Sequence, residues 1–558
     1  MKFDGILTEI NGFGKFQMRL VLIQVLSRMT LPCHFLLNNF MAAIPKHHCD
    51  ISALEELHGF GNLTLDQKLA VSLPAEQDGT LSSCRAFSSP QYQYLSGSNS
   101  SEGTSTVECQ NGWVFDNSTF KSTLATEWDL VCSKKGLNKA TATIFFVGVM
   151  LGAPLFGFLS DRFGRRRILL VSYLTSLTFA VLSAFSTSYV MFSVMRFFTG
   201  MALAGISIIS IALNVEWCGI QNRTFSGVII SLDWTLGSLF LVGIAYCVNE
   251  WRMLILAVTS PLLLSIATWR WLPESARWLM AKGRADEAHY YLIKCAEVNN
   301  RTKSMASITP RVSLNTGVGF THNPKKYTFV DLFKTPNMRK LAIYSGIVWY
   351  GVAFTYYGIT LNISDLGVNP YLTQFIFAST EIPMKTGVYF FLEKIGRRIG
   401  EMGSLLSTGV CLFINIFLSK DRWVIRTVVA VVGKSMSEAS FTIIFLYTTE
   451  FYPTVVRQNG LGYTSFIARL GVSISPLIML LEDVWHLLPP ITYCAVAIVA
   501  GSVASLLPET LNTRLPDCNQ GLEKQHLIKK KKKEIKLKKK KEIKLNLKSV
   551  QRTDEKSK

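Results

Sequence analysis

The sequence predicts an all-α membrane protein with twelve transmembrane helices arranged as two repeated six-helix halves. The chain has 558 residues, 49% of them hydrophobic, and is too apolar for an ordinary soluble enzyme. It contains long runs without charged residues, and roughly 18 or more apolar residues are enough to cross a membrane as a helix. A motif that returns in the second part of the chain indicates the duplication.

The apolar runs can be followed along the chain. Seven segments have no Asp, Glu, Lys or Arg: 140–160, 168–195, 197–215, 253–269, 341–364, 402–419 and 484–508. Five more carry isolated charges in apolar surroundings: 16–43, 224–249, 371–392, 423–448 and 458–481. Because the run 168–195 covers the third helix and the start of the fourth, we count six spans up to Trp271 and six from Leu341.

Three landmarks recur at nearly one offset, which is the evidence for repeated halves. They are Asp161–Gly164–Arg165 with Glu393–Gly396–Arg397 (offset 232), Glu216 and Arg223 with Glu450 and Arg457 (offset 234), and Pro273-Glu274-Ser275 with Pro508-Glu509-Thr510 (offset 235). The first landmark places an acid and a basic pair on a tight turn between two membrane helices. A membrane protein with two repeated halves is typically a transporter.

The spans divide the chain into five parts. These are an N-terminal segment 1–15, a first half 16–272 with a large loop 44–137, a central loop 273–340, a second half 341–507 and a tail 508–558. The large loop holds 6 Lys/Arg against 11 Asp/Glu, whereas the central loop holds 12 against 5. Since basic loops remain in the cytoplasm, we expect the large loop outside and both termini inside.

The two ends of the chain were searched for a cleavable signal and for a binding motif. No short apolar core near the N-terminus ends in a small-residue cleavage site, so the first span is expected to act as an anchor. The net charge of +20 comes largely from the tail, which has 13 lysines between Lys524 and Lys548. Such a run is typical of a solvated tail, with contact to anionic lipids as an addition. We expect the lipid bilayer as a partner and no nucleic acid.

The large loop has the chemistry of an oxidising, extracellular compartment. It contains Cys49, Cys84, Cys109 and Cys132, an even set that predicts two disulfides with three possible connectivities. It also contains glycosylation sequons at Asn62, Asn99 and Asn117.

Ionisable residues inside the expected spans are the first candidates for function, because a buried ion costs several kcal/mol unless it is paired. They are Arg28, Asp233, Glu381, Lys385, Lys434, Glu438 and Arg469. Glu381–Lys385 and Lys434–Glu438 are i,i+4 pairs that can neutralise each other on one helix face. Arg469 has no acid within a turn on its own helix, and a guanidinium can bind a carboxylate through two parallel hydrogen bonds. An ion pair of Arg469 with Asp233 or Glu438 on another helix is the alternative.

Four cations against three acids do not by themselves separate the possible functions. A carrier of organic anions, a carrier of organic cations or zwitterions, and a receptor or scaffold on a degenerate transport fold all remain open. An enzyme is disfavoured, because the sequence shows no metal cluster, no nucleophile with a paired base and no phosphate-cradling loop. No metal or cofactor is expected.

Several motifs resemble those of the organic-ion transporter family within the major facilitator superfamily, over about residues 1–515. They are His34…Asn39-Phe40 with Ala43-Ile44-Pro45, Thr126-Glu-Trp-Asp-Leu-Val-Cys132, Gly157…Asp161-Arg-Phe-Gly-Arg-Arg166, Asn214-Val-Glu216-Trp217, Glu274-Ser-Ala-Arg-Trp278 and Glu450-Phe-Tyr-Pro-Thr454…Arg457-Gln458. Within the family the chain is similar to the organic-anion branch, which has cations at the positions matching Lys385 and Arg469.

The resemblance implies a polyspecific plasma-membrane carrier of small organic anions that works by alternating access and by exchange. A dicarboxylate is one candidate counter-substrate, and the basolateral face is one of two alternatives. The implied substrate site consists of Asn39, Ser207, Trp234, Tyr356, Tyr357, Lys385, Phe441, Phe445 and Arg469. Its aromatic rings suit flat hydrophobic anions. Asp233 departs from the family pattern and could pair with Arg469, stay protonated through burial, or disfavour dianions.

A second set of residues is expected to form an inner gate at the cytoplasmic helix ends: Asp161, Gly164, Arg165, Arg166, Arg196, Glu216, Arg223, Glu450 and Arg457. We expect Asp161 to pair with the arginines at 165, 166 and 196, and we expect the pairs Glu216–Arg223 and Glu450–Arg457. Each exposed pair contributes only about 0–1 kcal/mol, but several together can set a two-state balance. The arginines also act as topology signals.

Overall fold

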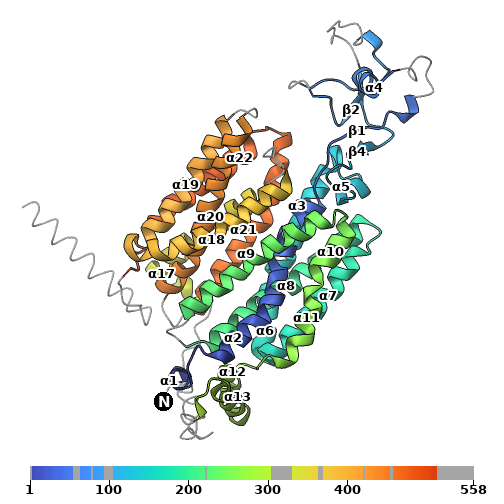
Figure 1. The fold of residues 1–558 in the computed structure, drawn as a ribbon. Coiled ribbons are helices and arrows are strands. Elements are labelled where there is room, and N and C mark those ends of the chain that lie inside the picture. Colours follow the sequence, from blue (N-terminus) through green and yellow to red (C-terminus); the bar gives the residue numbers. More distant parts are fainter. Residues whose placement is uncertain are drawn as a thin grey trace, which may run out of the picture.

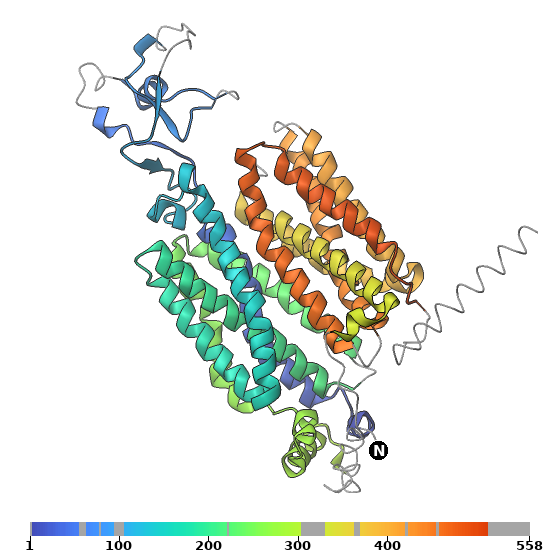
Figure 2. The same ribbon diagram turned by 180° about the vertical axis from the view of Figure 1, so that it is seen from behind.

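The computed structural model describes residues 3–54, 63–76, 80–93, 105–219, 223–302, 330–361, 369–418, 422–452 and 457–511. They form two bundles of long helices that lie side by side (Figures 1 and 2). The first bundle contains α2 (Lys15–Leu36), α6 (Lys135–Phe163), α7 (Arg165–Ala184), α8 (Tyr189–Trp217), α9 (Arg223–Cys247), α10 (Trp251–Thr259) and α11 (Pro261–Thr268), the last extended by the 3-10 helix η5 (Trp269–Trp271). Because α10 and α11 together form one span, this bundle provides six.

The second bundle provides the other six spans. Its helices are α17 (Pro336–Thr360), α18 (Pro370–Ile395), α19 (Arg397–Phe417), α20 (Trp423–Phe451), α21 (Arg457–Ile478) with the 3-10 helix η8 (Met479–Asp483), and α22 (Leu488–Ala504). The two bundles meet where α21 packs against α6 and α18 packs against α9. The expected twelve-helix arrangement in two halves is confirmed.

Not all twelve helices are equally apolar. Within the described residues, eight segments are long and apolar enough to cross a membrane by length and composition. The apolar stretch found in α22 has only 17 residues, 488–504. Helix α18 carries charged side chains at its centre, including Glu381 and Lys385. The weakest hydropathy signals therefore include the helix that holds part of the candidate site.

Close helix contacts in the first half depend on residues without a side chain. A Cβ added at Gly148 would lie 2.1 Å from the backbone oxygen of Phe197, and one at Gly152 would lie 2.2 Å from that of Met201. Gly148 and Gly152 are one turn apart on α6, so they form a smooth strip against α8. Small residues at such spacing let membrane helices approach closely, which increases dispersion contacts.

The short elements gather at the two ends of the bundles. They are α1 (Phe3–Glu9), α3 (Asn38–Met41), β1 (His47–Cys49), η1 (Ser52–Leu54), α4 (Leu65–Ser72), β2 (Arg85–Phe87), β3 (Thr106–Glu108), β4 (Trp113–Phe115), α5 (Leu124–Glu127), η3 (Cys132–Lys134), α12 (Ala276–Ala281), α13 (Ala285–Val298) and α16 (Asp331–Lys334). We call the end that carries the segment 42–134 the loop end. The opposite end, with Gly164 and Gly396, is the turn end. Helices α12 and α13 lie at the turn end (Figure 1).

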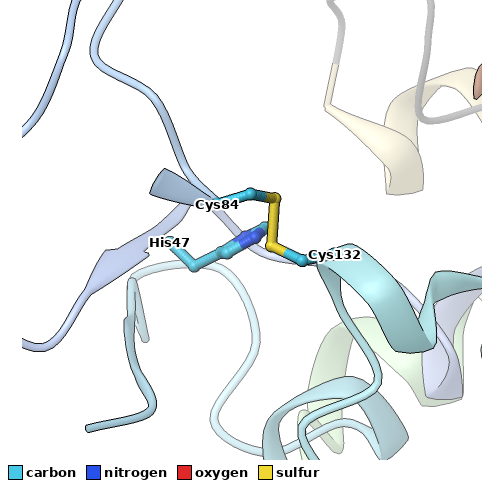
Figure 3. A group of neighbouring side chains, drawn as sticks. All are labelled: His47, Cys84 and Cys132. Atoms are coloured by element: carbon cyan, nitrogen blue, oxygen red, sulfur yellow. A yellow bond between two sulfur atoms is a disulfide. The ribbon is translucent and has the colours of Figure 1, made fainter. Parts of the chain in front are cut away.

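The loop segment projects beyond the helices and is held by two small sheets and two disulfides (Figures 1 and 2). Strand β1 pairs with β4 and β2 pairs with β3, both antiparallel. The disulfides are Cys49–Cys109 and Cys84–Cys132, which gives the connectivity that the sequence left open. His47 lies beside Cys84 and Cys132 (Figure 3). Because those two sulfurs are bonded to each other, they are not thiolates available to a metal.

Candidate functional site

A ring of four buried charges lies between α18 and α20. Lys385 Nζ is 3.2 Å from Glu381 Oε2 and 3.1 Å from Glu438 Oε1. Lys434 Nζ is 3.2 Å from Glu381 Oε1 and 3.6 Å from Glu438 Oε2. Each lysine therefore contacts both glutamates. We call Glu381, Lys385, Lys434 and Glu438 the charge quartet; it confirms the two i,i+4 pairs expected from the sequence and adds two pairs between helices.

The charge quartet also joins the two halves. Thr235 on α9 donates a hydrogen bond from Oγ1 to Glu381 Oε2 (2.9 Å) and accepts one from Lys385 Nζ (2.9 Å). Lys385 Nζ also donates to the backbone oxygen of Ser231 on the same helix (3.2 Å). Any relative movement of α9 and α18 must therefore break or exchange bonds to the charge quartet.

Two aromatic residues of the expected substrate site lie against the charge quartet. Trp234 Nε1 donates to the hydroxyl of Tyr356 (3.3 Å), which in turn donates to Glu381 Oε1 (3.2 Å). Lys434 Nζ lies 3.8 Å from the centre of the Tyr356 ring. Trp234 and Tyr356, which are expected to contact the substrate, thus also help to hold Glu381 and Lys434 in place.

Asp233 pairs with Arg28 on α2, which answers a question that the sequence left open. Its carboxylate accepts from Arg28 Nε in a short contact and from Nη2 at 3.4 Å, while Nη1 of the same arginine lies 3.4 Å from Ser210 Oγ. Both partners of this ion pair are nearly fully buried. The alternative in which Asp233 neutralises Arg469 is therefore wrong in this structure.

Arg469 on α21 has no hydrogen bond or ion pair to another side chain in the described part of the chain. Its Nε is buried without a hydrogen-bond partner, although the side chain as a whole is partly exposed. Arg28, Lys385 and Lys434 are each bound to a carboxylate, whereas the buried Arg196, nearer the loop end, contacts His34 instead. Tyr357 lies close enough to Arg469 and to Glu438 to interact electrostatically with both. No ion pair joins Arg469 to Glu438 among the described residues, where Glu438 binds the two lysines, so the second expected alternative for Arg469 is also wrong.

The remaining expected substrate residues are spread more widely. Tyr357 packs against Tyr356 and Phe146, with ring centres 5.1 and 5.2 Å apart, and Phe441 packs against Tyr356 at 5.3 Å. Phe445, by contrast, is 52% exposed. Its one described ring contact is with Trp349.

Two polar members of the expected site lie on other helices. Asn39 lies at the loop end, where its amide donates to the backbone oxygen of Thr360 (2.9 Å) and to Gln374 Oε1 (3.3 Å). Asn39 thus ties the halves together rather than joining the charge quartet. Ser207 is partly buried on α8, where its backbone oxygen accepts from Ser210.

The turn motif of the first half forms a compact ionic cluster. Arg165 binds Glu216 through two hydrogen bonds, Nε to Oε2 at 3.2 Å and Nη2 to Oε1 at 3.0 Å, and it also contacts Asp161 at 2.8 Å. The backbone N–H groups of Arg165 and Arg166 donate to Glu274. Burial raises the pKa of the Glu274 carboxyl, and these N–H donors oppose that shift.

The second half repeats the same cluster with matching residues. Arg397 donates to Glu450 from Nε (3.1 Å) and Nη2 (3.1 Å). The backbone N–H groups of Arg397 and Arg398 donate to Glu509 at 3.0 and 3.1 Å. In both halves an acid after the last helix thus caps the start of a middle helix. The repeat inferred from sequence offsets is therefore also a repeat of contacts.

Two expected pairs of the inner gate, Glu216–Arg223 and Glu450–Arg457, stay predictions, and one expected member needs a correction. Glu216 and Glu450 bind Arg165 and Arg397. The side chains of their expected partners, Arg223 and Arg457, fall outside the described residues. The ion pairs of both clusters, among described residues, join helices of the same half and do not cross between halves.

The correction concerns Arg196, which does not lie with Asp161. It is 20 residues from Glu216 on α8, about 30 Å along the axis, and so lies toward the loop end. There it contacts His34, donating to the backbone oxygen (3.2 Å) with Nη1 3.1 Å from Nδ1, and its guanidinium covers the Phe145 ring. The helix runs away from the turn end, so nearness to the motif in sequence does not bring Arg196 to it.

At the loop end, contacts do cross between the halves. Lys135 at the start of α6 binds Glu482 in η8 at 3.2 Å. Tyr371 at the start of α18 stacks on Phe40 of α3, with ring centres 5.3 Å apart. Together with the bonds of Asn39, these contacts hold the halves together at the loop end.

The sequence analysis missed one residue of the site, Thr235, and one buried acid outside it, Glu401. Thr235 follows Asp233 by two residues, so its hydroxyl was a possible partner for charges across the interface. Glu401 lies one turn after the Gly396 turn and is fully buried on α19, where Oε1 accepts from Ser440 (2.7 Å) and Oε2 has no hydrogen-bond partner. An acid so close to a turn motif suggests exposure, and only packing shows otherwise.

Comparison with known proteins places this geometry in a family. The model of the family "Sugar (and other) transporter" matches residues 81–521. Solute carrier family 22 member 7 of Rattus norvegicus is 44% identical over 534 residues, covering 94% of this chain and 99% of the relative. The human member 7 is 43% identical over 535 residues, with 94% and 97% covered. Member 6 of Oryctolagus cuniculus is 38% identical over 528 residues, covering 94% of each.

Solved structures agree on the fold. The xylose transporter XylE from E. coli, in an inward open conformation, matches with a TM-score of 0.57 at 14% identity, covering 89% of this chain and 98% of that chain. The protein is therefore a multi-pass membrane transporter rather than an enzyme, as expected from its sequence. The chain belongs to solute carrier family 22, the organic-ion transporter family of the major facilitator superfamily, and to its organic-anion branch.

Proposed function

We propose that the protein carries small organic anions across the plasma membrane, with Arg469 as the group that binds the anionic end of the substrate. The observation that carries this proposal is the pairing of charges. Arg28 is compensated by Asp233, and the charge quartet has two positive and two negative members. Of the four mid-span cations Arg28, Lys385, Lys434 and Arg469, only Arg469 has no carboxylate partner among the described residues, and its Nε is buried and unpartnered.

The same accounting disfavours a carrier of organic cations. Asp233, Glu381 and Glu438 each have a cationic partner at hydrogen-bonding or ion-pair distance. An organic cation would have to displace a lysine or arginine to reach any of them. A carboxylate or sulfonate needs only to approach Arg469, because a guanidinium can form two parallel hydrogen bonds with such an anion.

Alternating access follows from where the halves are joined. With the disulfide-bonded loop segment outside the cell and both termini inside, the contacts of Asn39, Lys135 and Tyr371 close the outer side. Transport requires these bonds to break while new ones form at the inner side. Exchange of one anion for another is the simplest cycle, because the loaded carrier returns with its site charge compensated.

The clusters at the turn end serve this cycle as rigid bodies. Arg165 with Glu216, and Arg397 with Glu450, fix the helices of each half to one another. Each half can therefore rotate as a unit when the inner side opens or closes. The two clusters thus stabilise the helix arrangement within each half, and their described ion pairs do not cross the interface between the halves.

Uptake of a labelled aromatic monocarboxylate by cells expressing Arg469 variants tests the proposal. Arg469→Lys keeps the charge but loses the planar pair of donors, and Arg469→Ala loses both. Losing a charge-assisted contact costs about 1.5–3 kcal/mol, a fall in affinity of about 10- to 150-fold. We expect both variants to reach the surface and to take up less anion, with alanine the more severe.

The matched control is Arg284→Lys, at an exposed arginine outside the spans whose partner is Glu287 on the same helix. It should leave uptake unchanged. Normal anion uptake by Arg469→Ala at normal surface level would remove Arg469 from the site. Uptake of a labelled organic cation in place of the anion would favour the cation carrier.

A further inference from the structure

We infer that the two glutamates of the charge quartet restrict the transporter to substrates with a single negative charge. This inference rests on the proposed function, because it concerns the same site. Without acidic partners, Lys385 and Lys434 would add two positive charges to that of Arg469 and make a strongly cationic site suited to dicarboxylates. In the structure, however, both lysines are paired with Glu381 and Glu438. This pairing lowers the negative charge of the substrate that the site can balance.

The first step is the count of charges around the expected substrate residues. The charge quartet is neutral, since Lys385 and Lys434 balance Glu381 and Glu438, and all four side chains are at most 6% exposed. One positive charge, that of Arg469, is left to balance a substrate. A monoanion brings the site to neutrality, whereas a dianion leaves it one charge negative in a poorly solvated place.

The second step is that the lysine donors are already in use. Lys385 Nζ has four oxygen neighbours: Ser231 O, Thr235 Oγ1 and one oxygen from each glutamate. Lys434 Nζ contacts both glutamates and the face of the Tyr356 ring. A second substrate carboxylate would thus have to replace an existing one. It would also meet the negative charge of the glutamate that it displaced.

The third step separates the two glutamates. Glu381 accepts from Thr235 and Tyr356 as well as from the lysines, so its removal would leave several buried donors unsatisfied. The carboxylate of Glu438 contacts, among described residues, only the two lysines. Glu438 is therefore the charge that can be removed with least damage to packing, and it is the residue that sets substrate charge.

Benzoate and terephthalate are suitable probes, because they share one aromatic ring and differ by one carboxylate. The wild type should take up benzoate and discriminate against terephthalate. Glu438→Gln keeps the side-chain shape and frees one positive charge beside the site. We expect the ratio of terephthalate to benzoate uptake to rise by about 10- to 150-fold, the gain of one charge-assisted contact.

Two further variants make the test specific. Glu401→Gln removes another buried carboxylate of the same half that has no lysine partner, and it should leave the ratio unchanged. The double variant Lys385→Gln/Glu438→Gln restores the original charge balance and should return the ratio toward that of the wild type. An unchanged ratio in Glu438→Gln at normal surface level would overturn the inference.

A measurement on the purified wild type stands in if Glu438→Gln does not reach the surface. Benzoate should raise the thermal unfolding temperature, and terephthalate at the same concentration should not. Equal stabilisation by both would also overturn the inference. If neither compound is taken up or stabilises the wild type, while a labelled organic cation is taken up, it is the proposed function that fails.

Discussion

At the scale of single residues, function depends on which charge is left without a partner. Composition allowed no decision, because the expected spans hold nearly equal numbers of acids and bases. The structure brings Arg28 to Asp233 and both lysines to both glutamates. A buried ion pair contributes little net stability, but breaking one exposes an uncompensated charge. The pairs thus show which of the seven candidate charges are compensated. Among them, only Arg469 has no oppositely charged partner in the described residues.

The Arg28–Asp233 pair gives the first prediction at this scale. Arg28→Ala should leave the Asp233 carboxylate buried and unpaired, at a cost of about 3–5 kcal/mol, and should sharply reduce the amount of protein at the surface. The double variant Arg28→Ala/Asp233→Ala removes both charges and should recover much of that loss. Surface biotinylation measures both. Recovery by Arg469→Ala/Asp233→Ala instead would show that Asp233 pairs with Arg469.

At the scale of secondary-structure elements, the two turn clusters explain why glycine stands at the ends of α6 and α18. Gly164 has φ of +105° and Gly396 has φ of +92°, a region that side chains with a Cβ rarely adopt. A Cβ at Gly164 would also lie 2.6 Å from Glu274 Oε2. The sharp turn directs the backbone N–H groups that follow each glycine toward Glu274 or Glu509. The backbone conformation of the glycine therefore makes these hydrogen bonds possible.

Gly164→Ala is therefore expected to be damaging. A side chain forced into this region costs about 1–3 kcal/mol, and the contact with Glu274 would disturb the N–H bonds of Arg165 and Arg166. We expect lower thermal stability of the purified protein and less of it at the surface. Gly157→Ala is the matched control, because a Cβ there meets no atom within 4 Å and the residue is helical. Equal effects of the two substitutions would contradict the role of the turn.

At the scale of the whole molecule, the described polar contacts between the two halves lie at the loop end and at the charge quartet. The loop end has ionic, amide and aromatic contacts between halves, through Lys135, Asn39 and Tyr371. The clusters of the turn end act within each half. This arrangement suits two rigid bodies that rock about a site between them, with the charge quartet bridging α9 and α18 near their centres.

The proposed orientation of the molecule predicts where carbohydrate is attached. Asn117 is exposed on the loop segment, and the other two sequons, Asn62 and Asn99, fall outside the described residues. Glycosidase treatment should lower the apparent mass, and substituting all three asparagines by Gln should abolish most of that shift. Asn300 heads a sequon beyond α13 at the turn end, so Asn300→Gln should change nothing. A mass unaffected by glycosidase in surface-expressed protein would contradict the orientation.

Prediction from sequence was strongest where the signal is local or repeated. The i,i+4 pairs within α18 and α20 follow from helix geometry, and the turn motifs follow from a recurring order of residues. Prediction was weakest for partners on different helices. For Asp233 the sequence offered a pair with Arg469, although its partner is Arg28 on α2, 205 residues away. Arg196 was placed at the wrong end, because residue type alone does not give depth along a helix.

The sequence by itself determined the membrane class, the twelve helices, the duplication, the family and seven charges inside the spans. These are properties of apolar length, of periodicity and of repeated motifs, which are present before any contact forms. Only the tertiary structure decided which charges neutralise one another, which cysteines pair and which end of the molecule joins the halves. Those outcomes depend on distances between segments far apart in the chain. The role of a buried charge depends on the residues that lie next to it in the fold. The same seven residues would therefore form a different site if the helices packed differently.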